Sequence, residues 1–565
     1  MLHLIPAVKS CVLAEGFLAK KAICCDQALD SRLEKVLKKL PQAADGAKLC
    51  ITVTGTEGEG YTLQITENAI AITGQSPVAA FYGIQTLRQL FAEEKVPCLT
   101  IEDAPDFPHR GFYHDVTRGR IPTVQTLKQL IDDMSYYKLN SLQLYVEHVF
   151  PFKETQGLLE KTGYMTPEEM KELEGYCHEN FITFIPSLST FGHMFELLNQ
   201  PQYQHLAVLP EYEADQNFWA DRMAHHTINP LKAESIGVVE SLIDQYLPLF
   251  ENNFFNICCD ETFDLDRYLE CEDPGKVYAD FVKKIIALVR SRGKDVMMWA
   301  DILLKHPEVI GDIPEETVFL NWFYRVPVPE ENIAKLAQLG RKQIVCPGTT
   351  TWNRFCEDVA VEEENICKMA EYGYKYGALG VLNTNWGDWG NPCSMELGMY
   401  GMVLGAAKSW AIDTQVNDEL YAAVNLHLYA GEDGIGMLKT LCRMHKDLVW
   451  RNFVRNYFSR KDGAELEWPL VTAEIVEAVQ QDYRELKAAL ENTTWEKDNY
   501  RIELLGAAQS LCLVAELSAK LAQLKVERLV DIESWAATYE ENWRRANKES
   551  ELAELTGFMR RCEAM

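Results

Sequence analysis

The chain has 565 residues, of which 47% are hydrophobic and 25% charged, and its formal net charge is −29. This composition is typical of a globular protein, and the length predicts two to four domains. Nucleic acids and anionic membranes both bind basic patches, so this strongly acidic net charge argues against both as partners.

The sixteen cysteines do not have the spacing of a disulfide framework. Two pairs are adjacent, Cys24-Cys25 and Cys258-Cys259, and others lie inside apolar segments, as small buried hydrophobic residues do. We therefore expect free thiols and a cytoplasmic, reducing location. No C-x-x-C pair indicates a zinc site, and we expect no metal and no cofactor. The N-terminus does not resemble a signal peptide, and we expect no apolar run of membrane-spanning length.

Residues 1–104 predict a small α+β domain. Three strands are expected at 49–54, 61–65 and 69–74, and a helix follows at about 77–91, where apolar residues recur at helical spacing. Prolines near residues 105–108 oppose regular structure and predict a linker.

Residues 105–410 alternate short apolar strands with amphipathic helices. Such a series predicts a (β/α)8 barrel, the α/β class of fold also called a TIM barrel. The alternative is a doubly wound open sheet, which usually has a glycine-rich phosphate loop after its first strand, and none follows here. The expected strands are 111–116, 141–147, 183–189, 254–261, 296–301, 318–324, 343–349 and 378–385.

Residues 411–565 predict a helical C-terminal domain. Long amphipathic helices are expected at 472–490, 499–524 and 532–551. This region either packs on the barrel or forms a homodimer contact, and we expect it to have no direct catalytic role.

An acidic pair, Asp260-Glu261, ends the apolar strand that begins at Phe254. One interpretation is that the strand emerges into water and Asp260 caps the next turn. The other is an active site in which two neighbouring acids are held at different pKa values, one donating a proton while the other stays charged.

Other predicted strands also end in polar and aromatic residues, and the carboxyl ends of barrel strands meet at one rim. Aromatic faces with carboxylates suit a sugar, whose C–H groups stack on tryptophan and whose hydroxyls bond to acids. A single tryptophan or histidine is more often structural, and a metal site is the alternative, but no closely spaced histidine pair supports it. The residues concerned are Glu147, His148, His193, Asp301, Trp299, Trp322, Tyr324, Trp352, Trp386 and Asp388.

Residues 45–410 resemble family 20 of the glycoside hydrolases, the β-N-acetylhexosaminidases. The resemblance rests on the runs 108–118 (Pro-His-Arg-Gly-Phe-Tyr-His-Asp-Val-Thr-Arg), 138–140 (Lys-Leu-Asn) and 299–301 (Trp-Ala-Asp), on Asp260-Glu261, and on the helix at 81–90. It implies retaining hydrolysis in which the substrate's own 2-acetamido oxygen is the nucleophile.

The resemblance also implies a role for each site residue. Glu261 would be the general acid and then the base, and Asp260 would orient the acetamido group and stabilise the developing positive charge. Arg110 would bind O3 and O4 of the sugar, and Asp388 would bind O4 and O6. Trp299, Trp322 and Trp386 would wall the pocket, with Glu147 and His193 as polar support behind the acid.

Two segments depart from the family pattern. The His-x-Gly-Gly that often precedes the acidic pair is replaced by 256–259 (Asn-Ile-Cys-Cys), and the Tyr-x-Asp after the seventh strand by Thr351-Trp352-Asn353. Tyr324 or Tyr145 would then take the role of the missing tyrosine, with Trp352 contacting substrate. These changes indicate a divergent, intracellular bacterial-type branch.

The sequence therefore predicts an exo-acting β-N-acetylhexosaminidase that releases terminal GlcNAc or GalNAc from a small-molecule or oligosaccharide substrate. Two alternatives remain open: a sugar-binding barrel that has lost catalysis, and a hydrolase acting on N-acetylglucosamine attached to protein.

Overall fold

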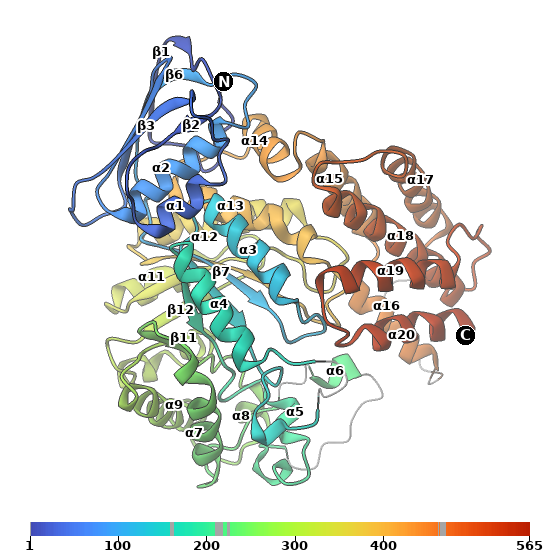
Figure 1. The fold of residues 1–565 in the computed structure, drawn as a ribbon. Coiled ribbons are helices and arrows are strands. Elements are labelled where there is room, and N and C mark those ends of the chain that lie inside the picture. The colour runs from blue at the N-terminus through green and yellow to red at the C-terminus, as the bar shows by residue number, and fades with distance from the viewer. Residues whose placement is uncertain (1, 159–162, 210–217, 223–225, 462, 464–470) are drawn as a thin grey trace.

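The computed structural model describes residues 2–158, 163–209, 218–222, 226–461, 463 and 471–565. Figure 1 shows three parts in chain order: an N-terminal sheet with two helices, a central barrel, and a helical region at the C-terminus. The predicted fold class, an α/β barrel between a small α+β domain and a helical domain, is confirmed.

The N-terminal domain is a six-stranded sheet in the order β1-β6-β4-β5-β3-β2. Side chains along β3 and β4 alternate between buried and exposed, so one face of the sheet is apolar, and α2 packs on β3, β4 and β5. The sequence predicted three of the strands and α2. The elements are β1 (Ser10–Phe17), β2 (Ile23–Cys24), α1 (Ser31–Leu37), β3 (Ala47–Val53), β4 (Tyr61–Ile65), β5 (Ala69–Gly74), α2 (Pro77–Leu90) and β6 (Pro97–Asp103).

The barrel sheet has eight strands in the order β10-β11-β12-β13-β14-β7-β8-β9, and the strand pairs are parallel. All eight were predicted, but several end earlier than expected because the chain leaves the sheet before it reaches the polar residues of the rim. The strands are β7 (His109–Asp115), β8 (Ser141–Tyr145), β9 (Thr183–Pro186), β10 (Phe254–Asn256), β11 (Asp295–Trp299), β12 (Val318–Trp322), β13 (Gln343–Cys346) and β14 (Gly380–Asn385).

Helices cover the outside of the barrel, and two of them begin at well-formed side-chain caps. The Thr123 side chain accepts a hydrogen bond from Thr126 N–H, and Thr166 and Glu169 form a reciprocal capping box. The longer helices are α3 (Val124–Tyr136), α4 (Pro167–Glu179), α7 (Ser235–Tyr246), α9 (Pro274–Ser291), α11 (Glu330–Gln338), α12 (Val359–Lys375) and α13 (Met399–Trp410); shorter ones are α5 (Phe195–Leu198), α6 (Phe218–Arg222), α8 (Phe263–Tyr268) and α10 (Asp301–Lys305).

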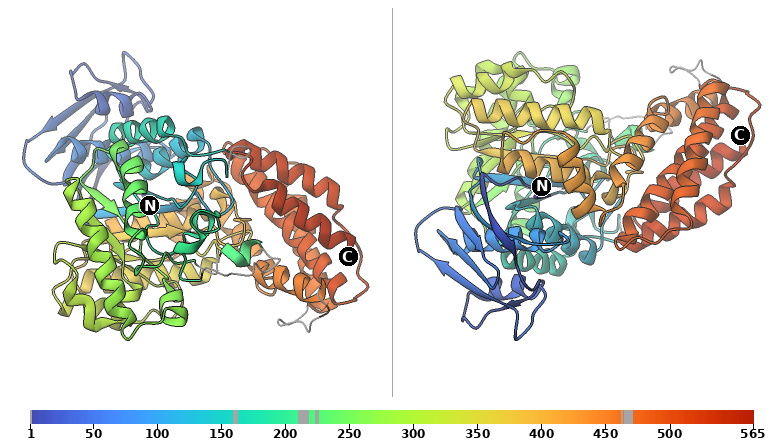
Figure 2. Two further views of the ribbon diagram at one scale, coloured as in Figure 1. Left: turned by 90° about the horizontal axis from the view of Figure 1, so that it is seen from below. Right: turned by 90° about the horizontal axis from the view of Figure 1, so that it is seen from above.

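The C-terminal region consists, over its described residues, of helices joined by loops, and it lies to one side of the barrel in both views of Figure 2. The three long helices that the sequence predicted here are present; the one expected at 532–551 ends earlier, at Ala546, and a further helix begins at Leu552. The elements are α14 (Asp418–Leu428), α15 (Gly434–His445), α16 (Trp450–Lys461), α17 (Ala473–Leu490), α18 (Asp498–Leu521), α19 (Ile532–Ala546) and α20 (Leu552–Ala564).

By length and hydropathy α18 could cross a membrane, which corrects the expectation that no apolar run is long enough. Its apolar stretch is mostly buried inside the protein, where α18 packs against α15, α16, α17 and α19. The central helix of a bundle is apolar on most sides for the same reason that a membrane helix is.

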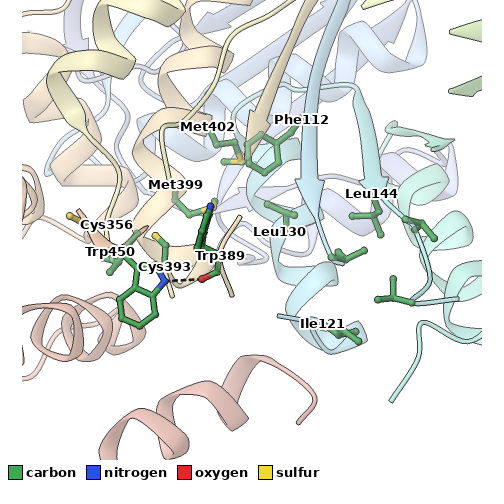
Figure 3. Close-up of a cluster of buried hydrophobic side chains, with 14 of the residues drawn as sticks. Phe112, Ile121, Leu130, Leu144, Cys356, Trp389, Cys393, Met399, Met402 and Trp450 are labelled. Carbon is green, nitrogen blue, oxygen red and sulfur yellow. Dashed lines mark hydrogen bonds between the residues drawn. The ribbon is translucent and has the colours of Figure 1, made fainter. Parts of the chain in front are cut away.

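One apolar core continues from the barrel into the helical region. Figure 3 shows the junction, where Trp450 at the start of α16 donates its indole N–H to the backbone oxygen of Trp389 at 2.8 Å. The Trp450 ring also packs against Phe355, which follows β13. The helical region is therefore fixed to loops on the barrel rim, and α16 is held beside them.

Candidate active site

A cavity of about 690 Å³ opens at the carboxyl ends of the barrel strands. Its walls come from the segments that follow β7, β10, β11, β12, β13 and β14, and from helix α16. This is the face on which barrel enzymes carry their active sites. The lining residues are Arg118, Asp260, Glu261, Trp299, Asp301, Leu304, Lys305, Trp322, Phe323, Tyr324, Arg325, Asn332, Trp352, Asn353, Trp386, Asp388, Trp389 and Arg451.

The segment after β10 carries the acidic pair in an unusual backbone conformation. Cys258, Cys259 and Glu261 have φ values of 57°, 67° and 49°, in the left-handed region that side chains other than glycine seldom adopt. Cys258 and Cys259 are buried as expected, but in this segment and not in the strand, which ends at Asn256. Strained backbone of this kind is stored at functional sites and needs support from its surroundings.

Two neighbours provide that support. Asp301 Oδ2 accepts a hydrogen bond of 3.0 Å from the backbone N–H of Glu261. On the other side, the backbone at Gly192 lies so close that an added Cβ would be 2.3 Å from the Asp260 carbonyl oxygen. Only glycine fits there, so this contact holds the loop after β9 against the acidic pair.

His193 comes from that loop and faces both acids. Its Nε2 lies 3.2 Å from Asp260 Oδ2 and 3.4 Å from Glu261 Oε2, and its Nδ1 is 3.2 Å from Arg118 Nη2. Burial alone would lower the pKa of His193, but the two carboxylates outweigh it and raise the pKa to about 10. Arg118 opposes this shift, but the raised pKa means that the ring is protonated at neutral pH and that Nε2 carries a proton toward the acids.

Arg118 connects His193 to a second acidic group. Its Nη1 lies 3.0 Å from Asp388 Oδ1 and 3.4 Å from Asp115 Oδ2, and its Nε lies 3.7 Å from Glu147 Oε1. Burial raises the pKa of Asp388 to about 6, although Arg118 opposes the shift. For Glu147, burial would raise the pKa, but His148 and Arg118 outweigh it and hold it far below its usual value.

Aromatic rings form the wall of the cavity. Trp299 is buried with its ring 5.9 Å from that of Trp386, and Trp386 donates its indole N–H to the Tyr324 hydroxyl at 2.8 Å. The Tyr324 ring is stacked on Trp322 at 4.9 Å and lies 5.1 Å from Trp352. These contacts fix the rings before any ligand arrives, so binding would cost little side-chain entropy.

Most of the predicted site residues are brought together here: Asp260, Glu261, Trp299, Trp322, Tyr324, Trp352, Trp386 and Asp388 line the cavity. Glu147 and His193 lie behind it, where they contact Arg118 and the acids. Tyr145 is fully buried and donates its hydroxyl to Glu147 Oε1 at 2.7 Å, so of the two candidate tyrosines only Tyr324 reaches the cavity.

Arg110 is the exception, and the expectation that it binds sugar hydroxyls is corrected. It is the second residue of β7, at the opposite end of the strand from the cavity, and it is fully buried. Its guanidinium bonds to Glu59 and Tyr82 of the N-terminal domain. Arg118, three residues beyond the end of β7, occupies the rim position instead.

Of the cavity residues that the sequence did not predict, Arg118 and Arg451 matter most, and the role of Asp301 as a backbone brace was also missed. Arg118 stands in the same motif as Arg110, and the rule that strand carboxyl ends form the site would have favoured it. Asp301 was noted only as a strand end. Arg451 could not be assigned to the site, because α16 was not predicted as a helix and its packing against the rim is a tertiary contact that the local sequence does not show.

Among the described residues, one group of acids and histidine has ligand atoms close enough for a metal, within 4.8 Å of one another: His193, Asp260 and Glu261. These atoms already contact each other, and the Arg118 guanidinium stands beside them. A cation would be repelled by that charge, so the arrangement suits proton transfer better than metal binding.

The catalytic-domain model described as "Glycosyl hydrolase family 20, catalytic domain" matches residues 107–411, and the model of "domain 2" of the same family matches residues 2–104. The chain belongs to glycosyl hydrolase family 20. Both matches follow the division seen in the structure between the N-terminal sheet and the barrel.

Curated relatives are about a quarter identical to this chain over the regions that match. A β-hexosaminidase of Porphyromonas gingivalis is 27% identical over 43% of this chain and 36% of its own length. A β-hexosaminidase of Emericella nidulans is 26% identical over 51% of this chain and 52% of its own. The matched regions thus span about a third to a half of these relatives.

Solved structures of family 20 show the same fold. A Flavobacterium johnsoniae chitobiase superposes with a TM-score of 0.63 at 16% identity and covers 96% of this chain and 99% of its own. A Vibrio harveyi exo-β-N-acetylglucosaminidase has a TM-score of 0.59 at 19% identity and covers 78% of both chains. The first of these likenesses extends over the helical region as well as the barrel.

Proposed function

We propose that this family 20 protein is an exo-acting β-N-acetylhexosaminidase that releases terminal GlcNAc or GalNAc from β-glycosides. The observation that carries the proposal is the acidic pair, Asp260 and Glu261, held on a braced backbone inside a cavity walled by tryptophan. Family membership and the names of the curated relatives support it. The family's substrate-assisted, retaining mechanism fits this site in three respects.

The first is the position of the acids. Asp260 and Glu261 are sequence neighbours, and Asp260 Oδ2 and Glu261 Oε2 both face one histidine nitrogen, His193 Nε2, at 3.2 and 3.4 Å. Two carboxylates that act as acid and nucleophile stand on opposite sides of the anomeric carbon. Neighbours on one short segment that face the same histidine are poorly placed to flank a sugar, so we assign the nucleophile to the substrate's acetamido oxygen.

The second is the bonding capacity of Asp260. Its Oδ2 faces His193, whereas its Oδ1 has no hydrogen-bond partner among the residues that the structure describes. A buried carboxylate oxygen without a partner is costly. We assign Oδ1 to the acetamido N–H, a bond that turns the acetamido oxygen toward the anomeric carbon and places negative charge beside the oxazolinium ring as it forms.

The third is the position of Glu261, which is partly exposed to the cavity with its carboxyl beside the protonated His193 nitrogen. In the proposed reaction Glu261 gives its proton to the glycosidic oxygen as the C–O bond breaks. It then takes a proton from the water that opens the oxazolinium ring, which restores the acid.

Assays of the purified protein on chromogenic β-GlcNAc, β-GalNAc and β-glucoside test the activity. We expect turnover of one or both acetamido sugars and none of the glucoside, which lacks the internal nucleophile. A protein that binds GlcNAc without turning over any of these substrates would instead be the inactive sugar-binding barrel.

A thiazoline analogue of GlcNAc, which mimics the cyclised intermediate, tests the mechanism. It should inhibit at far lower concentration than GlcNAc itself, because it resembles the transition state. Asp260→Asn should weaken inhibition by the thiazoline more than inhibition by GlcNAc, because the negative charge that faces the ring is lost. A covalent glycosyl-enzyme trapped on either acid would contradict the mechanism.

We also propose a reducing, cytoplasmic location. All sixteen cysteines are free in the structure, and Cys258 and Cys259 are buried directly before the acidic pair. Thiol counting under denaturing, non-reducing conditions should return close to sixteen for protein purified without reductant. Several stable disulfides would contradict this proposal.

A further inference from the structure

Two cysteines stand directly before the acidic pair, in a backbone conformation that does not suit them. Cys258 and Cys259 are buried and have φ values of 57° and 67°, in the left-handed region that glycine alone adopts without strain. Strain of this kind persists only where the surroundings hold it in place. The two side chains are therefore expected to make contacts that glycine could not make.

Those contacts reach the loop after β9, which carries His193. The Cys258 Sγ lies 3.3 Å from the Ser187 hydroxyl oxygen, and the Cys259 Sγ lies 3.4 Å from Thr190 Oγ1. Both hydroxyl residues are fully buried. Neighbouring thiols of the acidic segment thus contact this loop, residues 187–193, at two points.

Backbone contacts continue the same pairing on either side of the thiols. Thr190 Oγ1 donates to the Ile257 carbonyl oxygen at 2.6 Å, just before the two cysteines. Just after them, the Gly192 backbone lies against the Asp260 carbonyl oxygen. The two thiols fill the interval between these contacts, so the loop and the acidic segment are joined along their length.

The acidic segment has further anchors, whereas the loop depends on this pairing. The Cys259 carbonyl oxygen accepts from the Tyr278 hydroxyl of α9 at 2.8 Å, and the Glu261 N–H donates to Asp301. Loss of a thiol would therefore loosen the loop more than the acids. The ring of His193 would then be held less firmly at its distances of 3.2 and 3.4 Å from the two carboxylates.

We propose that Cys258 and Cys259 are positioning residues, whose thiols fix the loop and through it the place of His193 against the two acids. The inference rests on the proposed function, because it takes Glu261 as the proton donor to the leaving group. Both thiols are buried and neither lines the cavity, so they touch no substrate. They act through the protonated histidine ring, which orients both carboxylates.

Cys259→Ala is the main test, because it removes a thiol and keeps the strained backbone. With His193 less firmly held, proton transfer from Glu261 suffers most where the leaving group needs it. We expect kcat/KM to fall about tenfold on an alkyl β-GlcNAc and no more than about threefold on 4-nitrophenyl β-GlcNAc, within the range that a small misplacement costs. Cys258→Ala should give the same pattern, and Cys259→Ser, which keeps a hydroxyl facing Thr190, should recover part of the loss.

Cys512→Ala is the matched control. Cys512 is a fully buried thiol on α18 with a polar neighbour, Glu516 Oε1 at 3.6 Å, and it lies in the helical region. Both alanine variants should lose stability in denaturant unfolding, but the dependence on the leaving group should change only in Cys259→Ala. A Cys259→Ala loss equal on both substrates, or the same pattern in Cys512→Ala, would overturn the inference.

Thr190→Val removes the same contact from the side of the loop and leaves both thiols in place. It keeps the inference testable if Cys259→Ala does not fold, and it should produce the same dependence on the leaving group. Where both variants fold, the double variant should lose little more than the larger single loss, because the two side chains act through one contact. Losses that multiply would contradict a shared role.

The titration of His193 tests the positioning without any turnover. The two carboxylates, against burial and Arg118, raise the pKa of His193 to about 10, which NMR of labelled histidine can follow with His193→Gln for assignment. Cys259→Ala should lower this pKa by about one unit, because the ring is held less closely to the acids, and Cys512→Ala should leave it unchanged.

This readout separates the inference from the catalytic proposal. If wild-type protein hydrolyses no acetamido sugar but the pKa of His193 falls in Cys259→Ala alone, only the activity is refuted. If wild-type protein is active and neither the pKa nor the dependence on the leaving group responds to Cys259→Ala, only the positioning role is refuted.

Discussion

The two ends of strand β7 each place a buried arginine among acids and aromatic rings, and they differ in how completely the polar groups are satisfied. At the amino end, Arg110 donates to Glu59, Tyr82 and the backbone oxygens of Phe107 and Lys138. At the carboxyl end, Arg118 has its Nε without a hydrogen-bond partner among the described residues, within a group of several acids.

This difference distinguishes an arginine with a structural role from one with bonding capacity left for a ligand. At the amino end, which joins the barrel to the N-terminal domain, every guanidinium nitrogen of Arg110 has a partner. At the carboxyl end Asp260 Oδ1, Asp301 Oδ1 and Trp299 Nε1 have no hydrogen-bond partner among the residues described, and all three residues line the cavity. Unsatisfied buried polar atoms are costly, so those that line the cavity are groups that a substrate can complete.

Glu261→Gln should have the largest effect on activity, and it should leave the contacts at the amino end of β7 unchanged. Turnover should fall roughly a hundredfold or more, the usual result of losing a general acid. The fall should be smaller for aryl glycosides with good leaving groups, which need less protonation. Equal losses on good and poor leaving groups would show that Glu261 is not the acid.

Asp103→Asn should cause the largest loss of stability, and it acts at the amino end. Asp103 Oδ2 accepts from the buried Lys138 ammonium at 3.1 Å, and its carboxylate also accepts from the Trp410 indole. Without the negative charge, Lys138 is buried unpaired, which costs about 3–5 kcal/mol. Denaturant unfolding should report this loss.

The pH dependence of the Asp103 contribution has a definite sign. Burial would raise the pKa of Asp103, but Lys138 outweighs it and the pKa is lowered below 3.8. The stabilisation is therefore present above about pH 4 and is lost as pH falls through the folded-state pKa. If the difference in free energy of unfolding between wild type and Asp103→Asn were the same at every pH down to 2, this sign would be contradicted.

The pair Arg118→Lys and Arg110→Lys tests the comparison directly, since each keeps the charge and loses the planar fork. Arg118→Lys should lower kcat/KM by about tenfold to hundredfold, because the contacts of Arg118 position both the acids and the bound sugar. Arg110→Lys should instead destabilise by about 1–3 kcal/mol through the acceptors it leaves unpaired.

Stability and activity should therefore respond to different substitutions. Activity per folded molecule should be unchanged in Arg110→Lys, measured well below its unfolding midpoint. If Arg110→Lys lost activity while keeping its stability, the amino end would have to be part of the site.

The same comparison explains how far the sequence could predict the molecule. Alternating apolar strands and helices specified the barrel, and the apolar run that ends in Asp260-Glu261 identified the acids, because these patterns are local. The choice between Arg110 and Arg118 was made wrongly, although both stand in one motif, since it depends on where β7 begins and ends. A local sequence pattern locates the ends of a strand or helix less well than its middle.

Other features could not be predicted from local pattern at all. The left-handed backbone of Cys258, Cys259 and Glu261 is imposed by Asp301 and by the loop at Gly192, both distant in sequence. Arg451 reaches the cavity through the packing of Trp450 against the rim. A homodimer contact through the C-terminal helices stays a prediction.

Asp301→Asn should have the smallest effect on activity, and its effect on the pH dependence of stability opposes that of Asp103 in sign. Burial, with the charge of Asp260 beside it, raises the pKa of Asp301 to about 8, from 3.8. Between about pH 4 and 8 the folded protein thus holds a proton that the unfolded chain releases, so this group's contribution to stability falls as pH rises. Asn cannot titrate, yet its side-chain oxygen can still accept from Glu261 N–H, so activity should fall only a few-fold.

The measurement is the free energy of unfolding at several pH values from 5 to 9, for wild type and for Asp301→Asn. Between pH 5 and 8 the free energy of unfolding should fall less for the variant than for wild type, by up to about 1.4 kcal/mol per pH unit for one proton. Above pH 8 the two curves should have the same slope. In wild type, Asp103 contributes no slope across this range, because it is ionised in both states throughout. Identical slopes for wild type and Asp301→Asn would mean that Asp301 is already charged in the folded protein, and that the carboxyl end of the barrel tolerates its acids no less easily than the amino end.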